Sequence, residues 1–232
     1  MTGAPRFPGC RAVLLDWGGT LDADGLAWKE RVALLLRAEG HAIPSERFDP
    51  AFYRADDALV GALGPTVSFR ETARRLMEGL ARGLAIEDGA LIGRLATVFV
   101  DESLAVARRN RPLLEALARR YRLGIVSNFY GNLETVCEDC GIHDLFSTIM
   151  DSARVGWEKP DPRIFGRALE ALAVGPAEAV FVGDSLPRDM AGARALGMPH
   201  VWLVAETGER RAACCPADPV VHSLKGLEEL LL

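Results

Sequence analysis

Short apolar runs that end at polar residues recur along the chain and predict the strands of a buried sheet. They occupy residues 12–16, 123–128, 179–184 and 200–204 and are rich in branched apolar side chains. Each run has the length of a strand and is bounded by glycine, proline or polar residues. Because the runs are apolar throughout, we expect a parallel sheet that is covered on both faces.

Helical patterns separate the predicted strands. Apolar positions recur at helical spacing in residues 112–120, 133–140, 161–172 and 187–196. This alternation of strands and helices is typical of an α/β fold, here a doubly wound, Rossmann-like parallel sheet. The tail, residues 217–232, adds a short extended piece and a closing helix.

The stretch from residue 21 to residue 109 has a different pattern, with helical spacing almost throughout. Its helical segments read LAWKERVALLLRAEG, AFYRADDALVGAL, FRETARRLMEGLARG and DGALIGRLATVFVDESLAVARR. Only LATVFV (95–100) also fits a strand. We therefore expect an α/β core formed by residues 1–20 and 110–232, with an all-helical domain inserted at 21–109.

Polar side chains follow the predicted strands, where ligands bind in open parallel sheets. These residues are Asp16, Thr20, Ser127, Asn128, Asp184 and Asp189, with Lys159 in the loop WEKPDP. Carboxylates can hold a hard cation such as Mg²⁺, which accepts phosphate oxygens as further ligands. A lysine and a hydroxyl can neutralise and orient the same phosphate, and one carboxylate is left to attack it.

Four ordered segments carry a resemblance to a known family. DWGGT (16–20), SN (127–128), KPDPRIF (159–165) and GDSLPRD (183–189) resemble the four motifs of the haloacid dehalogenase superfamily of hydrolases. Each motif alone is unspecific, but four in order at strand ends and helix starts are specific. The resemblance covers the whole predicted sheet domain, and the helical insertion lies where many members carry a helical cap.

The resemblance implies a Mg²⁺-dependent phosphatase that acts on a small phosphorylated metabolite. Asp16 would be the nucleophile that forms an aspartyl-phosphate, and Lys159 would neutralise charge on it. The implied phosphate-binding residues are Thr20, Ser127, Asn128 and Lys159. The implied Mg²⁺ ligands are Asp16, the carbonyl of Gly18 and Asp184, with Asp189 either as a further ligand or as a partner of the ligands. Such chemistry depends mainly on positioning and charge stabilisation.

Gly18 departs from the pattern, because phosphatases of this superfamily usually carry an acid/base aspartate two residues after the nucleophile. General acid–base catalysis typically contributes about 10²–10⁴-fold. We therefore expect acyl and aryl phosphates to react faster than alkyl phosphates, and Gly18→Asp to accelerate the alkyl phosphates. The candidate replacements for the acid are Asp22, Asp24, Lys29 and Glu30.

Two alternative functions remain open at this point. One is a phosphonatase-like or other hydrolysis that needs no acid at position 18, in which Lys29 could form a Schiff base. The superfamily's dehalogenases need no metal, whereas Asp184 and Asp189 suggest that this chain keeps one. The other is a catalytically degenerate protein that binds phosphate or a regulatory partner.

Composition and charge narrow the class of protein. Hydrophobic residues make up 49% and charged residues 25%, as in ordinary globular proteins. The formal charge of −5, from 27 basic and 32 acidic residues, disfavours nucleic acid as a partner. No apolar run approaches the ~18 residues that span a membrane, and AVLL is shorter than the about 7–15 apolar residues of a secretory signal.

Cysteine usage favours a cytoplasmic protein. Five cysteines in a chain of this size argue against a disulfide scaffold, and a reducing compartment is the default. Cys137 and Cys140 in CEDC fall late in a predicted helix and are interpreted as packing thiols. The pattern gives no indication of the oligomeric state.

Overall fold

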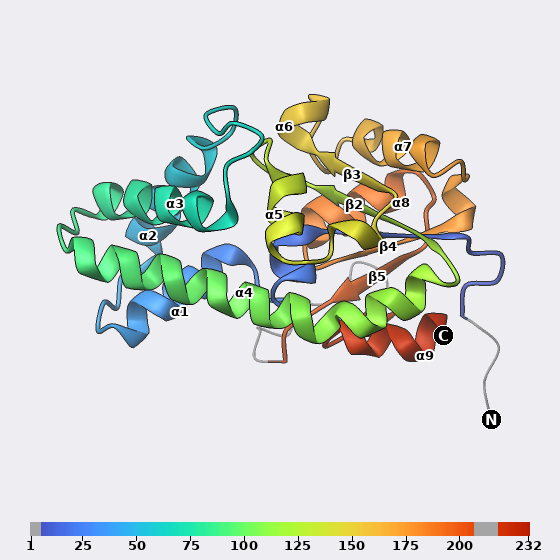
Figure 1. Cartoon of the computed structure of the whole chain (residues 1–232), viewed down its shortest axis with the longest axis horizontal. Helices are drawn as coiled ribbons and strands as arrows, with labels where there is room; N and C mark the ends of the chain where they lie inside the picture. The colour runs from blue at the N-terminus through green and yellow to red at the C-terminus, as the bar shows by residue number, and fades with distance from the viewer. Residues whose placement is uncertain (1–5, 207–217) are drawn as a thin grey trace.

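A computed structural model describes residues 6–206 and 218–232 and contains one six-stranded parallel sheet (Figure 1). The strands are β1 (Ala12–Leu15), β2 (Arg122–Ser127), β3 (Thr148–Asp151), β4 (Ala179–Gly183), β5 (His200–Leu203) and β6 (Val220–Val221). Their order is β3-β2-β1-β4-β5-β6, so the direction of winding changes between β1 and β4. This confirms the predicted doubly wound α/β fold and places a topological switch point beside β1.

Alternate residues of the central strands enter two separate cores, one on each face of the sheet. Val13 and Leu15 pack on the face covered by α4 (Gly89–Ala118), α5 (Leu133–Asp139) and α9 (Leu227–Leu231). Ala12 and Leu14 pack on the opposite face, against α7 (Pro162–Ala171) and α8 (Ala191–Ala195). Both faces are therefore buried, as the apolar runs predict.

The helical insertion is confirmed and lies at one end of the sheet, on the left of Figure 1. It consists of α1 (Trp28–Ala38), α2 (Ser45–Asp57), α3 (Phe69–Leu84) and the first part of α4. α2 and α3 approach each other closely. A Cβ on Gly79 of α3 would lie only 3.0 Å from the Cβ of Ala55 on α2. Glycine at this position allows the two helices to pack.

α4 is one helix of 30 residues that joins the insertion to the core (Figure 1). The sequence predicts two helical segments here, 88–109 and 112–120, which the structure merges. The segment LATVFV, which fits either a strand or a helix by pattern, is helical. The domain boundary predicted at 109/110 falls inside this helix.

The sequence analysis did not predict β3, and its composition explains why. β3 is a four-residue edge strand in which Thr148, Ile149 and Met150 are only partly buried. The remaining short elements are single turns: η1 (Trp17–Leu21), η2 (His143–Leu145), α6 (Ser152–Val155), η3 (Pro176–Glu178), η4 (Leu186–Met190) and η5 (Leu224–Gly226).

The cysteines that the structure describes are free thiols. Cys137 and Cys140 are buried in the core and Cys10 is partly buried, which agrees with packing thiols. Burial raises the pKa of Cys137 and Cys140, which keeps both protonated. Cys214 and Cys215 lie outside the described residues. Among the helices of the described ranges, none is both long and apolar enough to cross a membrane.

Candidate active site

The carboxyl ends of β1, β2 and β4 meet at the switch point. Leu15 pairs with Ile125 on one side and with Val182 on the other. The next residue, Asp16, donates its backbone N–H to the carbonyl of Val182 at 3.0 Å. The polar residues that follow these three strands therefore lie at the same edge of the sheet, as the sequence predicts.

Lys159 links two of the carboxylates in the site. Its Nζ lies 2.7 Å from Asp16 Oδ1 and 2.7 Å from Asp189 Oδ1, and the residue is only 3% exposed. Burial opposes the charge on Lys159, but Asp16 and Asp189 outweigh it and raise the pKa of the ammonium group. Lys159 is therefore a fixed cation beside Asp16.

The Asn128 side chain binds both the backbone N–H and the backbone carbonyl of Lys159. The Asn128 Nδ2 donates to the carbonyl of Lys159 at 3.1 Å, and Asn128 Oδ1 accepts its N–H at 2.6 Å. The Lys159–Pro160 peptide is cis. The Asn128 side chain thus positions the lysine loop, and its predicted contact with a phosphoryl group stays a prediction.

Asp16, Asp184 and Asp189 form a cluster of carboxylates. Each offers one carboxylate oxygen, and these oxygens lie within 4.8 Å of one another. Burial, followed by repulsion from Asp189 and Asp16, raises the pKa of Asp184 well above its usual value. Burial also raises the pKa of Asp189, to about 6, although Lys159 opposes this. Three crowded carboxylates fit a hard divalent cation, which would offset their mutual repulsion.

The loop after Asp16 orients Asp184. Thr20 Oγ1 donates to Asp184 Oδ1 at 3.0 Å, and Trp202 Nε1 donates to the Asp184 carbonyl at 2.9 Å. Gly19 has a φ of +85°, and a Cβ there would lie 2.6 Å from Asp184 Oδ2. Glycine is therefore required at position 19. The Thr20 hydroxyl, predicted to bind phosphate, is directed to this carboxylate.

Ser127 ends β2 at the same edge of the sheet and is 3% exposed. The loop beyond it is fixed by Asp151, whose Oδ2 accepts the N–H groups of Gly131 at 2.8 Å and Leu133 at 3.1 Å. The sequence analysis missed Asp151 because it missed β3, which carries this residue to the site. A carboxylate after the short run TIM (148–150) was the signal that the sequence offered.

The indole of Trp28 lies next to Gly18. A Cβ at position 18 would lie 3.3 Å from Trp28 Nε1, which itself donates to Asp22 Oδ2 at 2.7 Å. The gain expected from Gly18→Asp presumes open space at this position, whereas even a Cβ there would be in tight contact with the indole. The sequence analysis missed Trp28, since an aromatic residue in the first turn of a helix resembles an ordinary core residue.

Two of the candidate replacements for the acid are committed to other contacts. Asp22 is fully buried, and its Oδ1 accepts the N–H of Gly19 at 2.8 Å. Asp24 pairs with Arg109 and accepts the N–H of Leu224 at 3.2 Å. Both carboxylates therefore shape the loop after β1.

The other two candidates lie on α1. Lys29 Nζ pairs with Asp49 at 2.7 Å and lies over the ring of Tyr53. Burial lowers the pKa of Lys29, but Asp49 outweighs this and the pKa is raised overall. Glu30 is exposed, whereas Trp28 and Arg31 on the same helix are buried.

Comparisons with known proteins agree with this geometry. A sequence profile described as haloacid dehalogenase-like hydrolase matches residues 10–197. The phosphoserine phosphatase of Thermus thermophilus is 39% identical over 217 residues, which cover 85% of this chain and 82% of that protein. The haloacid dehalogenase-like hydrolase domain-containing protein 3 of Bos taurus is 42% identical over 113 residues, or 49% of this chain. That match spans 45% of the bovine protein, which is less than half its length.

Solved structures share the fold across almost the whole chain. A dehalogenase superposes with a TM-score of 0.65 at 21% identity, over 97% of this chain and 98% of the other. A phosphatase of the same superfamily from Thermococcus onnurineus superposes with a TM-score of 0.55 at 24% identity, over 95% and 97%. Together with the profile match and the strand-end carboxylates, these likenesses lead to one conclusion: the chain belongs to the haloacid dehalogenase-like hydrolases.

Proposed function

We propose that this chain is a Mg²⁺-dependent phosphatase that transfers the phosphoryl group of a small phosphorylated metabolite first to Asp16 and then to water. The observation that carries the proposal is the position of Lys159, 2.7 Å from both Asp16 and Asp189, whose carboxylates form one cluster with that of Asp184. The likeness to a protein named phosphoserine phosphatase supports this reaction class.

In the first half-reaction, a carboxylate oxygen of Asp16 forms a bond to phosphorus while the bond from phosphorus to the leaving oxygen breaks. Lys159 Nζ, 2.7 Å from Asp16 Oδ1, offsets the negative charge that builds up as Asp16 and the anionic phosphoryl group approach each other. Ser127, at the end of β2, is proposed to hold a phosphoryl oxygen. Most of the acceleration comes from this positioning.

Asp16, Asp184, Asp189 and the carbonyl of Gly18 are the proposed ligands of Mg²⁺. When bound there, the ion supplies positive charge where Asp16 meets an anionic phosphoryl group. Thr20 and Trp202 hold Asp184 in place for this role. Asn128 in turn places the lysine that shares Asp16 and Asp189.

In the second half-reaction, a water oxygen attacks the phosphorus of the aspartyl-phosphate, phosphate leaves and the Asp16 carboxylate is restored. Position 18 offers no carboxylate to take the proton of this water. The same position offers no proton to the leaving oxygen in the first step. We therefore expect a slow second step and a detectable phosphorylated protein.

The helical insertion is proposed to act as a cap over this site. The Tyr130 hydroxyl, in the loop after β2, donates to Asp56 of α2 at 2.5 Å. Asp139 of α5 accepts the N–H of Phe69 at 2.7 Å, at the start of α3. These contacts hold the insertion against the strand ends that carry the site.

A phosphonatase-like reaction through a Schiff base receives no support from Lys29. A Schiff base forms from a neutral amine, and the Asp49 partner raises the pKa of Lys29. The ammonium group is therefore held in its charged, non-nucleophilic form.

The proposed function is tested by the release of phosphate from acyl, aryl and alkyl phosphates with Mg²⁺ and with a chelator. We expect turnover that chelation removes and Mg²⁺ restores, and Asp16→Asn to lower it by roughly 10³-fold or more because the attacking charge is lost. Full activity in chelator, or an Asp16→Asn variant that keeps most of its activity, would overturn the proposal. Phosphate binding without turnover would instead support the degenerate binding protein.

A further inference from the structure

The backbone does not explain why position 18 is glycine. Gly18 has φ −70° and ψ 120°, a conformation that any L-residue adopts. The three atoms nearest to an added Cβ all belong to the indole of Trp28, with Nε1 at 3.3 Å, Cδ1 at 3.5 Å and Cε2 at 3.6 Å. A side chain at position 18 is therefore limited by Trp28.

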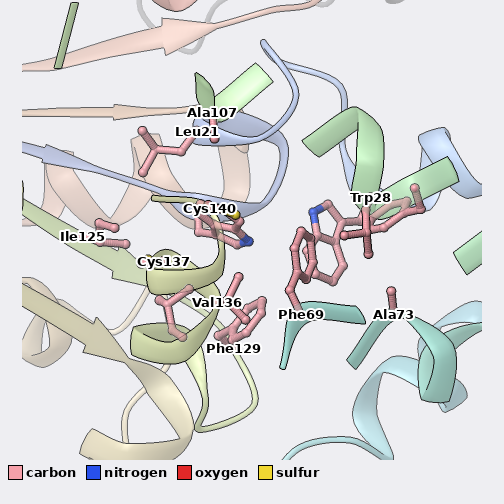
Figure 2. Packing of buried hydrophobic residues seen from close by; sticks show 14 of the residues in the cluster. Leu21, Trp28, Phe69, Ala73, Ala107, Ile125, Phe129, Val136, Cys137 and Cys140 are labelled. Carbon is pink, nitrogen blue, oxygen red and sulfur yellow. The ribbon is translucent and has the colours of Figure 1, made fainter. Parts of the chain in front are cut away.

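The indole is fixed among aromatic rings from the insertion and the core. Its ring centroid lies 4.9 Å from that of Phe99, 5.7 Å from Phe129 and 5.9 Å from Phe69. Figure 2 shows Trp28 and Phe69 on the insertion side and Phe129 on the core side. Trp28 is only 9% exposed, so it cannot move aside without disturbing this packing.

A buried ion pair anchors the indole to the active-site loop. Asp22 Oδ2 accepts from Trp28 Nε1 at 2.7 Å, from Arg31 at 2.9 Å and from Ser103 at 3.0 Å. Arg31 also donates to the carbonyl of Phe99 at 2.9 Å. Residues from α1 and α4 thus hold the carboxylate that fixes Trp28.

We propose that Trp28, anchored by Asp22 and Arg31, fills the side-chain space of position 18 and makes this site selective for phosphates whose leaving oxygen departs without being protonated. This inference rests on the proposed phosphatase function. The indole N–H is already donated to Asp22 and indole is a donor only, so Trp28 supplies no acid. Acyl and aryl phosphates have weakly basic leaving oxygens and fit such a site.

The test combines changes at positions 18 and 28 and measures kcat/KM for substituted phenyl phosphates and for an alkyl phosphate. Trp28→Leu opens the space while Asp22 keeps Arg31 and Ser103 as donors. Gly18→Ala is the matched control, since it adds only the Cβ. The variants are Gly18→Ala, Gly18→Asp, Trp28→Leu and the double variant Gly18→Asp/Trp28→Leu.

We expect the wild type to favour aryl over alkyl phosphates by about 10²–10⁴-fold, the range that general acid catalysis contributes. Gly18→Asp alone should lose aryl activity at least about tenfold and keep the preference, because the carboxyl group meets the indole. The double variant should reduce the preference at least about tenfold, since the acid then fits. Little preference in the wild type, or a reduced preference with full aryl activity in Gly18→Asp alone, would overturn the inference.

A stability measurement separates this inference from the proposed function. We expect Gly18→Asp and Trp28→Leu to be coupled in stability. The fold-increase in the unfolding equilibrium constant of the double variant should be at least about tenfold smaller than the product of the fold-increases of the two single variants. Purely additive effects would contradict the filling of position 18 by Trp28. If no phosphate is released from any substrate but the coupling is present, the proposed function fails and the packing stands.

Discussion

At the scale of single residues, Lys159 is the side chain that the site needs most, because its ammonium group pairs with two buried carboxylates. We expect Lys159→Ala to lower kcat/KM by roughly 10²–10³-fold, since the cation that faces Asp16 is lost. Asp16 and Asp189 would then repel each other without a shared partner. The exposed Lys225 offers a matched control, and Lys225→Ala should leave the kinetics unchanged. A Lys159→Ala variant with more than about half of the wild-type rate would refute this role.

The candidate site divides into residues that the sequence could predict and residues that it could not. Asp16, Ser127 and Asp184 follow apolar runs, and the parallel sheet brings such strand ends together whatever the details of the packing. Trp28 and Asp151 act through contacts that depend on the final placement of α1 and β3. No spacing in the sequence encodes those contacts, because apolar and capping residues of the same kind occur throughout the chain.

At the scale of elements, the Asp22–Arg31 pair fastens the loop after β1 to α1 and α4. The pair is buried, with side-chain exposures of 0% for Asp22 and 5% for Arg31, and it also contacts Ser103. We expect Asp22→Asn to lower the free energy of unfolding by about 3–5 kcal/mol, because the buried Arg31 loses its buried carboxylate partner and keeps only the exposed Glu102, at 3.4 Å. An asparagine also cannot accept hydrogen bonds at both ends of its side chain, as Asp22 does.

Urea unfolding of this variant is compared with that of Glu102→Gln. Glu102 also faces Arg31, at 3.4 Å, but its side chain is 52% exposed. Its replacement should therefore change the stability by less than about 1 kcal/mol. Equal losses of unfolding free energy in Asp22→Asn and Glu102→Gln would show that burial of the Asp22–Arg31 pair does not contribute to stability.

The elements themselves were predictable where a strong pattern extends over many residues. The strands β1, β2, β4 and β5 and the helices α5 and α7 were predicted within a few residues of their observed bounds. β3 escaped because an edge strand with partly exposed Thr148, Ile149 and Met150 needs no long apolar run. α4 was divided in two because Pro112 favours a helix start, whereas packing against both the insertion and the core keeps the helix continuous.

At the scale of the whole molecule, folding brings Asp16, Asp184 and Asp189 together and thereby links stability, pH and metal binding. Burial and repulsion raise the pKa of Asp184, and burial raises that of Asp189 to about 6, from a usual value of 3.8. At these two carboxylates, the metal-free folded protein thus binds protons more tightly than the unfolded chain. The contribution of Asp189 to stability is complete below the unfolded pKa of 3.8 and is lost as the pH rises through about 6, and that of Asp184 has the same sign.

Mg²⁺ and protons should therefore compete for the same carboxylates. We expect Mg²⁺ to raise the thermal unfolding temperature more above about pH 7 than at about pH 5, because the ligands must lose their protons before they bind the ion. Calorimetric titration should show proton release on Mg²⁺ binding between about pH 5 and pH 7. Asp184→Asn removes one of the shifted carboxylates, so it should weaken Mg²⁺ binding and reduce its pH dependence. A stabilisation by Mg²⁺ that is equal at both pH values would mean that the ion binds elsewhere, because any site formed by these three carboxylates must displace protons.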